Sequence, residues 1–161
     1  MATLVRPLSP RDPSEGHRSA TPLELFADLC YVVAVAQAAL TLHHEIVEGH
    51  AGHGIVYFSL AFFGIWWAWL NFAWFNSAYD PDDTLHRVLT LLQIFGSLVL
   101  AAGVPRIFEA DFTLGIIGYV IMRVGLVLMW LRAAAGDPER RSTAMSYIGG
   151  LLVVQAAWVG A

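Results

Sequence analysis

The chain has 161 residues, of which 57% are apolar and 14% are charged, and its mean hydropathy is +0.59. Soluble domains usually contain about 45–50% apolar and about 25% charged residues, so this composition indicates a protein that lies in lipid. The net charge of −4 and the absence of lysine exclude the basic surface that nucleic-acid binding requires, so we expect no nucleic-acid partner. Cys30 is the single cysteine, which excludes a disulfide framework and the cysteine-rich zinc and redox motifs.

Five long apolar runs follow a polar segment over residues 1–20, which we expect to be a cytoplasmic tail. A membrane-crossing helix needs about 20 apolar residues, and only helices and closed barrels satisfy the backbone hydrogen bonds in lipid. The runs lack the alternation of barrel strands, so we predict an all-α, polytopic transmembrane helical bundle over residues 21–161. The predicted spans lie near residues 23–42, 55–76, 85–104, 112–131 and 144–161. Because the last run continues to the final residue, we expect the N-terminal portion of a longer protein.

The placement of arginine predicts the orientation of the bundle. Basic residues close to the ends of spans remain on the cytoplasmic side. The N-terminal tail, the turn before the third span and the segment after the fourth contain most of the arginines, whereas the two opposite loops contain only Arg106. The N-terminus is therefore predicted to be cytoplasmic.

Four charged residues fall inside the predicted spans, where a charge costs at least about 2.5–3.5 kcal/mol. At about 1.5 Å per residue, Asp28 lies roughly 7–8 Å below the cytoplasmic face and Arg123 roughly 12 Å below it. We interpret Asp28 and Arg123 as a buried ion pair between the first and fourth spans. Glu24 and Arg87 lie at a similar shallow depth and are a second candidate pair.

Structural interpretations remain open for these charges. Thr21 and Glu24 have the spacing of a capping box with Pro22 at the first helical position, so Glu24 has a backbone partner in that interpretation. Asp28 and Arg123 have no capping role. They are either a static pair that fixes helix packing or part of a substrate or proton pathway.

The segment before the third span has the same cap and proline pattern. Asp80 is the expected cap, Pro81 is the expected first helical residue, and Asp82 and Asp83 lie close to the positive end of the helix dipole. Asp83 also lies four residues before Arg87, so it is a candidate counter-ion for that arginine.

The second span contains tryptophan near its middle as well as at its end. Tryptophan is expected at the membrane–water interface, which fits Trp74 but not the three tryptophans before it. Those three, Trp66, Trp67 and Trp69, either fill packing space or form an aromatic wall beside Asn71. If they line a pocket, we expect it in the cytoplasmic half, where the binding or ion-pair candidates converge in depth. The candidates are Glu24, Asp28, Asn71, Asn76, Arg87 and Arg123.

The predicted outer loop over residues 42–54 is rich in imidazole and carboxylate groups, which zinc accepts as ligands. They belong to His43, His44, Glu45, Glu48, His50 and His53. Their spacing matches no zinc motif, so we predict no metal site and no cofactor. The catalytic signatures GxSxG and HExxH and the phosphate-binding glycine loop are absent, and we expect no enzyme activity.

Several motifs occur together along the chain. They are residues 21–26 with Asp28, the tryptophan cluster at 66–69, the aspartate–proline turn at 80–83 with Arg87, and Tyr119 with Arg123. In this combination the chain resembles the bacterial low-temperature-requirement protein A (LtrA) family. The resemblance implies a multi-pass helical protein of the bacterial cytoplasmic (inner) membrane. The family name describes growth in the cold and implies no particular biochemical activity.

The function that we expect is a transporter-like protein for a small polar solute or for protons. In this hypothesis Asp28 and Arg123 engage the solute or relay protons, and Glu24 with Arg87 gates the entrance. The alternative is a non-transporting structural or sensory membrane protein in which the same charges only fix helix packing. The expected partners are the lipid bilayer and either the remainder of the same polypeptide or a second copy.

Overall fold

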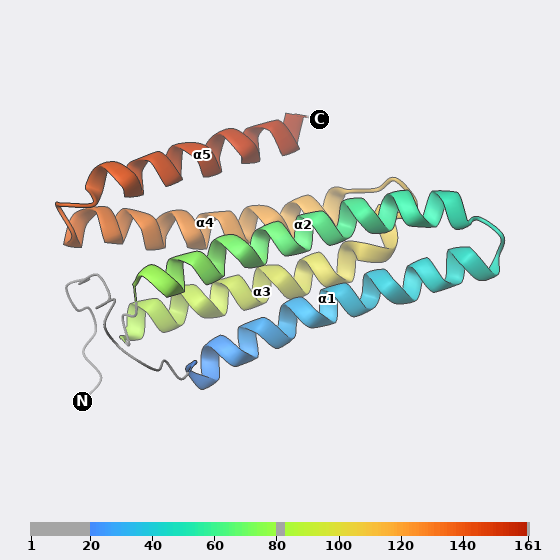
Figure 1. Cartoon of the computed structure of the whole chain (residues 1–161), viewed down its shortest axis with the longest axis horizontal. Coiled ribbons are helices and arrows are strands. Elements are labelled where there is room, and N and C mark those ends of the chain that lie inside the picture. The colour runs from blue at the N-terminus through green and yellow to red at the C-terminus, as the bar shows by residue number, and fades with distance from the viewer. Residues whose placement is uncertain (1–19, 80–82, 161) are drawn as a thin grey trace.

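Five helices joined by short turns make up the described part of the chain, residues 20–79 and 83–160, in the computed structural model (Figure 1). They are α1 (Pro22–Val47), α2 (Ala51–Ala78), α3 (Thr84–Ile107), α4 (Thr113–Gly136) and α5 (Arg141–Gly160). Consecutive helices run in opposite directions, so the turns after α1 and α3 lie at one end of the bundle and those after α2 and α4 at the other. The predicted all-α bundle is confirmed. The predicted tail, apart from residue 20, lies outside the described residues.

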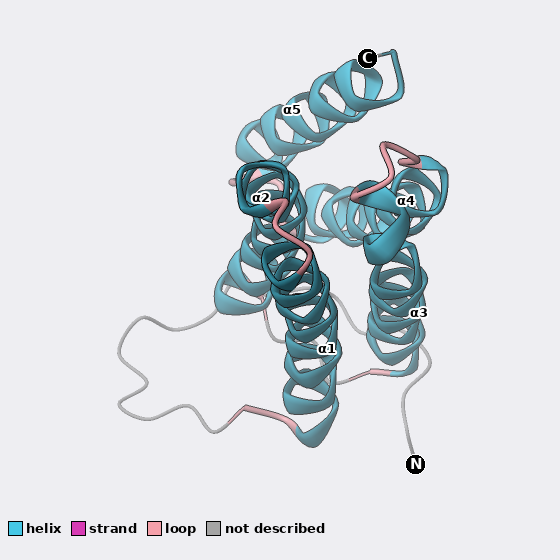
Figure 2. Cartoon of the chain, turned by 90° about the vertical axis from the view of Figure 1, so that its right-hand side faces the viewer, coloured by secondary structure: helices cyan, strands magenta, loops and turns pink. Residues whose placement is uncertain are grey.

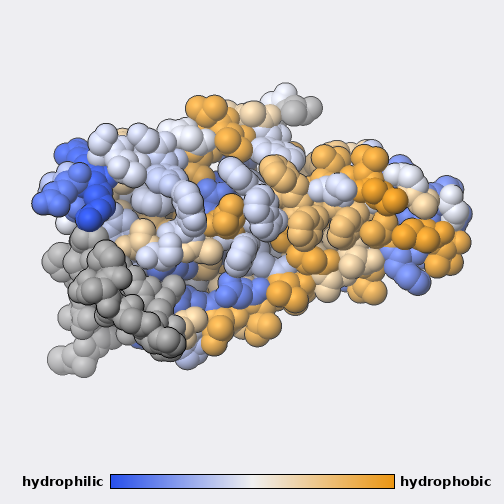
Figure 3. All heavy atoms as spheres, viewed as in Figure 1, coloured by the Kyte–Doolittle hydropathy of each residue, from blue (hydrophilic) through white to orange (hydrophobic). Residues whose placement is uncertain are grey.

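Four of these helices, α1 to α4, are long and apolar enough to cross a membrane. The fifth predicted span forms a helix, α5, over Arg141–Gly160. Apolar residues cover much of the surface along α1 and α2, and strongly hydrophilic residues gather toward the two ends of the bundle (Figure 3). Large apolar side chains such as Leu29 and Leu40 are 60% and 64% exposed, which fits contact with lipid.

The first two helices extend beyond the apolar runs that predicted them. α1 continues to Val47 and α2 begins at Ala51, so the predicted loop over residues 42–54 is wrong except at residues 48–50. Gly49 in this turn has a φ of 86°, which glycine adopts without steric cost. The difference arises because hydropathy marks the part of a helix that lipid covers and not the point where its backbone hydrogen bonds end.

The helices do not all pack against one another. α3 lies along α1 on one side and along α4 on the other, α1 also packs against α2, and α4 packs against α5. α2 makes limited contact with α3 and α4. In the described part of the chain its backbone does not approach that of α5, although the ring centroids of Trp74 and Tyr147 lie 5.9 Å apart. Figures 1 and 2 show α5 on the side of α2 and α4 that faces away from α1 and α3. The contact between α2 and α5 is therefore made by side chains and not by close backbone packing.

Glycine permits a very close approach of α3 and α4. A Cβ atom on Gly118 would lie 2.5 Å from the backbone nitrogen of Leu100 and 2.7 Å from the carbonyl oxygen of Gly96. A Cβ atom on Gly96 would lie 2.9 Å from the carbonyl oxygen of Gly118. These neighbours are backbone atoms that cannot move without moving the helix. Small residues at this contact therefore hold α4 at a fixed position against α3, as in other membrane helix pairs.

The start of α1 forms the predicted capping box. The backbone nitrogen of Glu24 donates to Oγ1 of Thr21 at 3.2 Å, and the backbone nitrogen of Thr21 donates to Oε2 of Glu24 at 2.9 Å. Pro22 is the first helical residue. The capping interpretation of Glu24 is confirmed, and this contact accounts for a buried carboxylate at the helix start.

The start of α3 differs from the prediction. Asp83 is the N-cap, since its Oδ1 accepts from the backbone nitrogen of His86 at 2.9 Å and the helix begins at Thr84. The roles predicted for Asp80 and Asp82 fall outside the described residues. The buried carboxylate of Asp83 also pairs with Arg132 of α4: Nη1 lies 3.0 Å from Oδ1, and Nη2 bonds to Oδ2.

The fork of Arg132 therefore binds both oxygens of Asp83, which is the stronger geometry for an arginine–carboxylate pair. This contact joins the start of α3 to the end of α4. The predicted contact between Asp83 and Arg87 stays a prediction.

Gly118→Ala is expected to lower the thermal stability of the protein, because the new methyl group would overlap the backbone of α3. Overpacking of this kind costs about 1–3 kcal/mol. Gly64→Ala is the matched control, since a Cβ atom at Gly64 meets no other atom within 4 Å. The melting temperatures of the two variants, measured by fluorescence on full-length protein in detergent, provide the test. Equal temperatures would contradict the close α3–α4 contact.

Asp83→Asn is expected to destabilise the protein, because Arg132 loses a carboxylate partner at a nearly buried position. Removing one partner of a buried pair typically costs about 3–5 kcal/mol. Asparagine is also a good N-cap, so the loss reports on the ion pair and not on the cap. A double variant, Asp83→Asn with Arg132→Met, should recover part of the loss in the same melting experiment. A double variant less stable than Asp83→Asn alone would count against the pair.

Candidate functional site

Asp28 is held by an aromatic partner on the neighbouring helix. The indole Nε1 of Trp69 in α2 donates to Oδ1 of Asp28 at 2.9 Å. Asp28 is partly buried near the start of α1. Hydrogen bonds to an ionised group are stronger than neutral ones, so this contact both satisfies the carboxylate and joins α1 to α2. Trp69 belongs to the predicted aromatic wall, but it acts here through the polar edge of its ring.

Arg123 is buried on α4, where 5% of its surface is exposed. Its Nη2 donates to the hydroxyl of Tyr119 at 2.6 Å, and its guanidinium carbon lies 4.5 Å from the centroid of that ring. Its Nε has no hydrogen-bond partner in the part of the chain that the structure describes. Arg123 and Tyr119 are one turn apart on the same helix, so this hydrogen bond and this ring contact both lie within α4.

The predicted ion pair between Asp28 and Arg123 is wrong as a direct contact. Both residues are described, and the structure shows neither a hydrogen bond nor an ion pair between them. The physical reason is the arrangement of the helices, because α1 packs on α2 and α3 and its backbone does not approach α4.

Tyr31 joins the helix of Asp28 to the helix of Arg123. It is 3% exposed on α1, and its hydroxyl donates to Sδ of Met122 in α4 at 3.4 Å. Asp28, Tyr31, Trp69, Tyr119 and Arg123 are called the polar layer below. On the α3 side, Nε2 of Gln93 donates to the backbone carbonyl of Met122 at 2.7 Å and ties this level of α4 to α3.

Sequence reasoning did not propose the two tyrosines or the glutamine as site residues, although Tyr119 appears with Arg123 among the motifs of the family resemblance. The available signal was their spacing, since Tyr31 follows Asp28 by three residues and Tyr119 precedes Arg123 by four. Residues three or four apart share one face of a helix. Gln93 interrupts an apolar run, and a polar residue in such a run is a signal that the sequence alone provides.

The other predicted candidates have contacts or positions of their own. Asn71 donates to the backbone carbonyl of Trp67, one turn earlier on α2, at 2.6 Å. Asn76 is buried, and its Oδ1 accepts no hydrogen bond from the described residues. Glu24 belongs to the capping box and Arg87 is exposed on α3. Of the six candidates, Asn71 lines one of the two cavities described next, and their convergence in a single cavity stays a prediction.

Two cavities lie beside the gap between α2 and α5. The first, called the Tyr119 cavity, has a volume of about 270 Å³ and lies where α2, α3, α4 and α5 meet; its lining includes Tyr119 and Gln155. The second, called the Trp67 cavity, has a volume of about 540 Å³ and lies between α2 and α5; its lining includes Trp67 and Asn71. The Tyr119 cavity shares a residue with the polar layer.

The three central tryptophans of α2 have separate surroundings. Trp69 bonds to Asp28, and Trp67 lines the Trp67 cavity. Trp66 is 40% exposed, and its ring centroid lies 6.3 Å from that of Phe63. Only Trp67 therefore fits the predicted wall beside Asn71.

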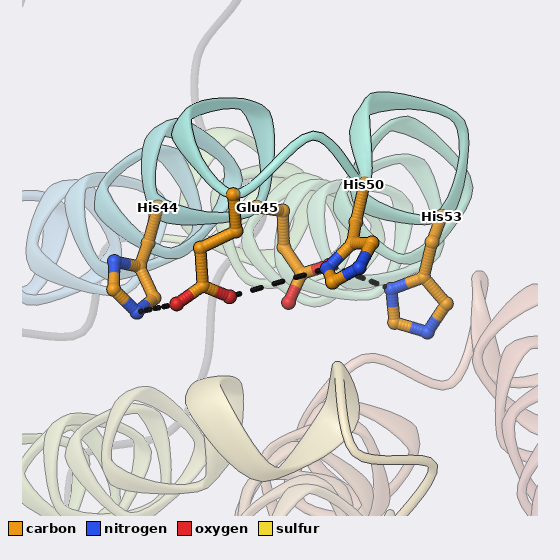
Figure 4. A network of polar contacts seen from close by, with 5 residues as sticks. His44, Glu45, His50 and His53 are labelled. Carbon is orange, nitrogen blue, oxygen red and sulfur yellow. Dashed lines mark hydrogen bonds and ion pairs between the residues drawn. The ribbon is translucent and has the colours of Figure 1, made fainter.

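Imidazole and carboxylate groups form pairs across the α1–α2 turn (Figure 4). Nε2 of His44 lies 3.1 Å from Glu48, and Nδ1 of His53 lies 2.9 Å from Glu45. Nδ1 of His50 lies 4.0 Å from Glu48. Over residues 20–79 and 83–160, no group of three or more histidine, cysteine, aspartate or glutamate side chains is arranged to hold a metal ion. Of these contacts, the one between Glu45 and His53 joins the end of α1 to the start of α2.

Aromatic and charged residues pack at the opposite end of the bundle. The rings of Trp130 in α4 and Tyr147 in α5 stack with centroids 4.6 Å apart. The hydroxyl of Tyr79 donates to Asp137 at 3.2 Å; burial, and then the charge of Asp137, raise the pKa of Tyr79. Burial alone would raise the pKa of Asp137, but hydrogen bonds from Arg140 and Tyr79 and the charge of Arg140 lower it.

Comparison with known proteins identifies the family. The family model described as "Bacterial low temperature requirement A protein (LtrA)" matches residues 19–161. An uncharacterized protein of Rhizobium meliloti (strain 1021) is 27% identical over 137 residues, which are 84% of this chain and 32% of that protein. This chain thus spans about a third of the length of that curated relative. No solved structure gives a significant match.

The resemblance seen in the sequence is therefore confirmed over most of the chain. Four of its helices are also able to cross a membrane. The chain is a multi-pass integral membrane protein that belongs to the bacterial low-temperature-requirement A (LtrA) family.

Proposed function

We propose that the polar layer belongs to a transporter-like protein of the bacterial inner membrane, and that it conducts protons or a small polar solute without covalent catalysis. The observation that carries the proposal is that Asp28 and Arg123 are each held by an aromatic side chain and not by each other. Charges retained inside a bilayer commonly mark substrate, ion or proton pathways. A closed ion pair would occupy both charges, whereas this arrangement leaves the Nε of Arg123 without a partner in the described region.

In this proposal Asp28 is the residue that exchanges protons, because the guanidinium of Arg123 remains charged. Tyr31 is a buried side chain of α1 that bonds to α4, and a phenol hydroxyl both donates and accepts hydrogen bonds. A polar group of a solute therefore meets a suitable partner at Asp28, at Tyr31 and at Arg123, and a proton meets one at Asp28 and at Tyr31.

A structural or sensory role is the second candidate, and the same contacts provide its support. Trp69 and Asp28 join α2 to α1, and Tyr31 and Met122 join α1 to α4. In this role the polar layer only fixes the packing of the helices. Apolar residues of similar volume often replace buried polar pairs without loss of stability.

Asp28→Asn is expected to reduce proton flux to the level of vesicles without protein. The amide keeps an acceptor oxygen for Trp69 but cannot exchange a proton. The measurement uses the full-length protein in vesicles that contain the pH indicator pyranine, under an imposed pH gradient with valinomycin and potassium. Glu109→Gln is the matched control, since Glu109 is an exposed carboxylate in the α3–α4 turn. The proton flux of this variant should equal that of the wild type.

Equal flux in the wild type, the Asp28→Asn variant and protein-free vesicles would contradict proton transfer. The structural role is distinguished by a double variant, Asp28→Leu with Arg123→Met, tested for growth in the cold in cells that lack the natural gene. Normal growth of these cells would support the structural role, whereas loss of growth with normal amounts of folded protein would support transport.

A further inference from the structure

The Tyr119 cavity combines an apolar wall with two polar groups. Aliphatic side chains such as Leu60 and Leu100 and the aromatic rings of Phe112 and Trp158 form most of its lining. Tyr119 and Gln155 supply the polar groups. Small-molecule sites in proteins have this character, since a few polar groups in an apolar pocket fix the orientation of the ligand.

Gln155 has no partner for either end of its amide. Its Oε1 and Nε2 are both buried, and neither forms a hydrogen bond with the described residues. Buried polar groups in native proteins nearly always have a partner, because an unsatisfied one is costly. Since Gln155 lines the Tyr119 cavity, a molecule in this cavity would satisfy both the donor and the acceptor.

Tyr119 offers a further donor at the same place. Its hydroxyl oxygen accepts from Arg123 at 2.6 Å, which leaves its own hydrogen for another acceptor. Its ring centroid lies 6.1 Å from that of Trp158, so two aromatic rings lie side by side in the lining. A ligand with one small group that both donates and accepts hydrogen bonds fits these polar contacts, and an apolar body fits the rest.

The position of the cavity favours a ligand that dissolves in lipid. The backbones of α2 and α5 do not approach each other within the described residues, and the cavity lies where these two helices meet α3 and α4. Gly64 on α2 lines the cavity, and a Cβ atom there would meet no other atom within 4 Å. The α2 side of the cavity is therefore unfilled.

From these observations we infer that the Tyr119 cavity binds a small amphipathic molecule with one hydroxyl, carboxyl or amide group on an apolar or aromatic body. Gln155 and Tyr119 bind the polar group, and the aliphatic and aromatic lining binds the body. This inference goes beyond the proposed function and does not depend on it, because it requires binding but not transport.

The test compares two probes that differ in a single hydroxyl group, para-fluorophenol and fluorobenzene. Full-length protein in lipid nanodiscs is titrated with each probe, and fluorine NMR line broadening is measured against nanodiscs without protein. We expect saturable broadening of para-fluorophenol beyond that of empty nanodiscs. Gln155→Leu is expected to weaken the affinity for para-fluorophenol by about tenfold, the factor that corresponds to about 1.4 kcal/mol, and to leave fluorobenzene unchanged.

Gly64→Leu provides a second, independent variant in case Gln155→Leu does not fold. The leucine fills the cavity from α2 and should abolish the saturable broadening. Gly149→Leu is the matched control, since Gly149 on α5 is equally open but does not line the cavity, and it should bind as the wild type does. Gel filtration verifies that each variant is folded.

Two results would overturn the inference. One is broadening of para-fluorophenol no greater than in empty nanodiscs, which would mean partition into lipid only. The other is saturable broadening that survives Gly64→Leu in folded protein, which would place the probe elsewhere.

Discussion

The close contact between α3 and α4 determines where the functional side chains lie. Because Gly96 and Gly118 let the two backbones meet, α4 has a fixed position against α3. That position brings Met122 next to Gln93 and within reach of Tyr31 from α1. The layer of polar side chains through the bundle depends on this contact. The opposite side, between α2 and α5, has no comparable contact in the described region, and the two cavities lie beside it.

The buried charges follow from the cost of placing an ion in lipid. A charged side chain there requires a partner, and a hydrogen bond from an indole or to a phenol is one such partner. Asp28 uses Trp69 and Arg123 uses Tyr119. Aromatic residues in this bundle therefore do more than fill space. Asp83 and Arg132 pair directly because the end of α4 lies against the start of α3.

Local features of this fold were predictable from the sequence, and contacts between distant segments were not. The capping box at Thr21 and Glu24 depends on residues three positions apart, so the sequence contains all of it. The pairing of Asp83 with Arg132 depends on which helices are neighbours, which apolar runs do not reveal. The same limit explains why the contact expected between Asp28 and Arg123 is not formed. The two residues were predicted at a similar depth in the membrane, but a similar depth does not show whether the backbones of α1 and α4 are neighbours.

The central claim is that Tyr31, and not Asp28, connects α1 to α4. Cysteine cross-linking in membranes tests it most directly, in a background with Cys30→Ser and with a short bifunctional thiol reagent. We predict faster cross-linking of the Tyr31→Cys and Met122→Cys pair than of the Asp28→Cys and Arg123→Cys pair, because only the first two side chains are in contact. Faster cross-linking of the second pair would contradict the account and restore a direct contact between the two charges.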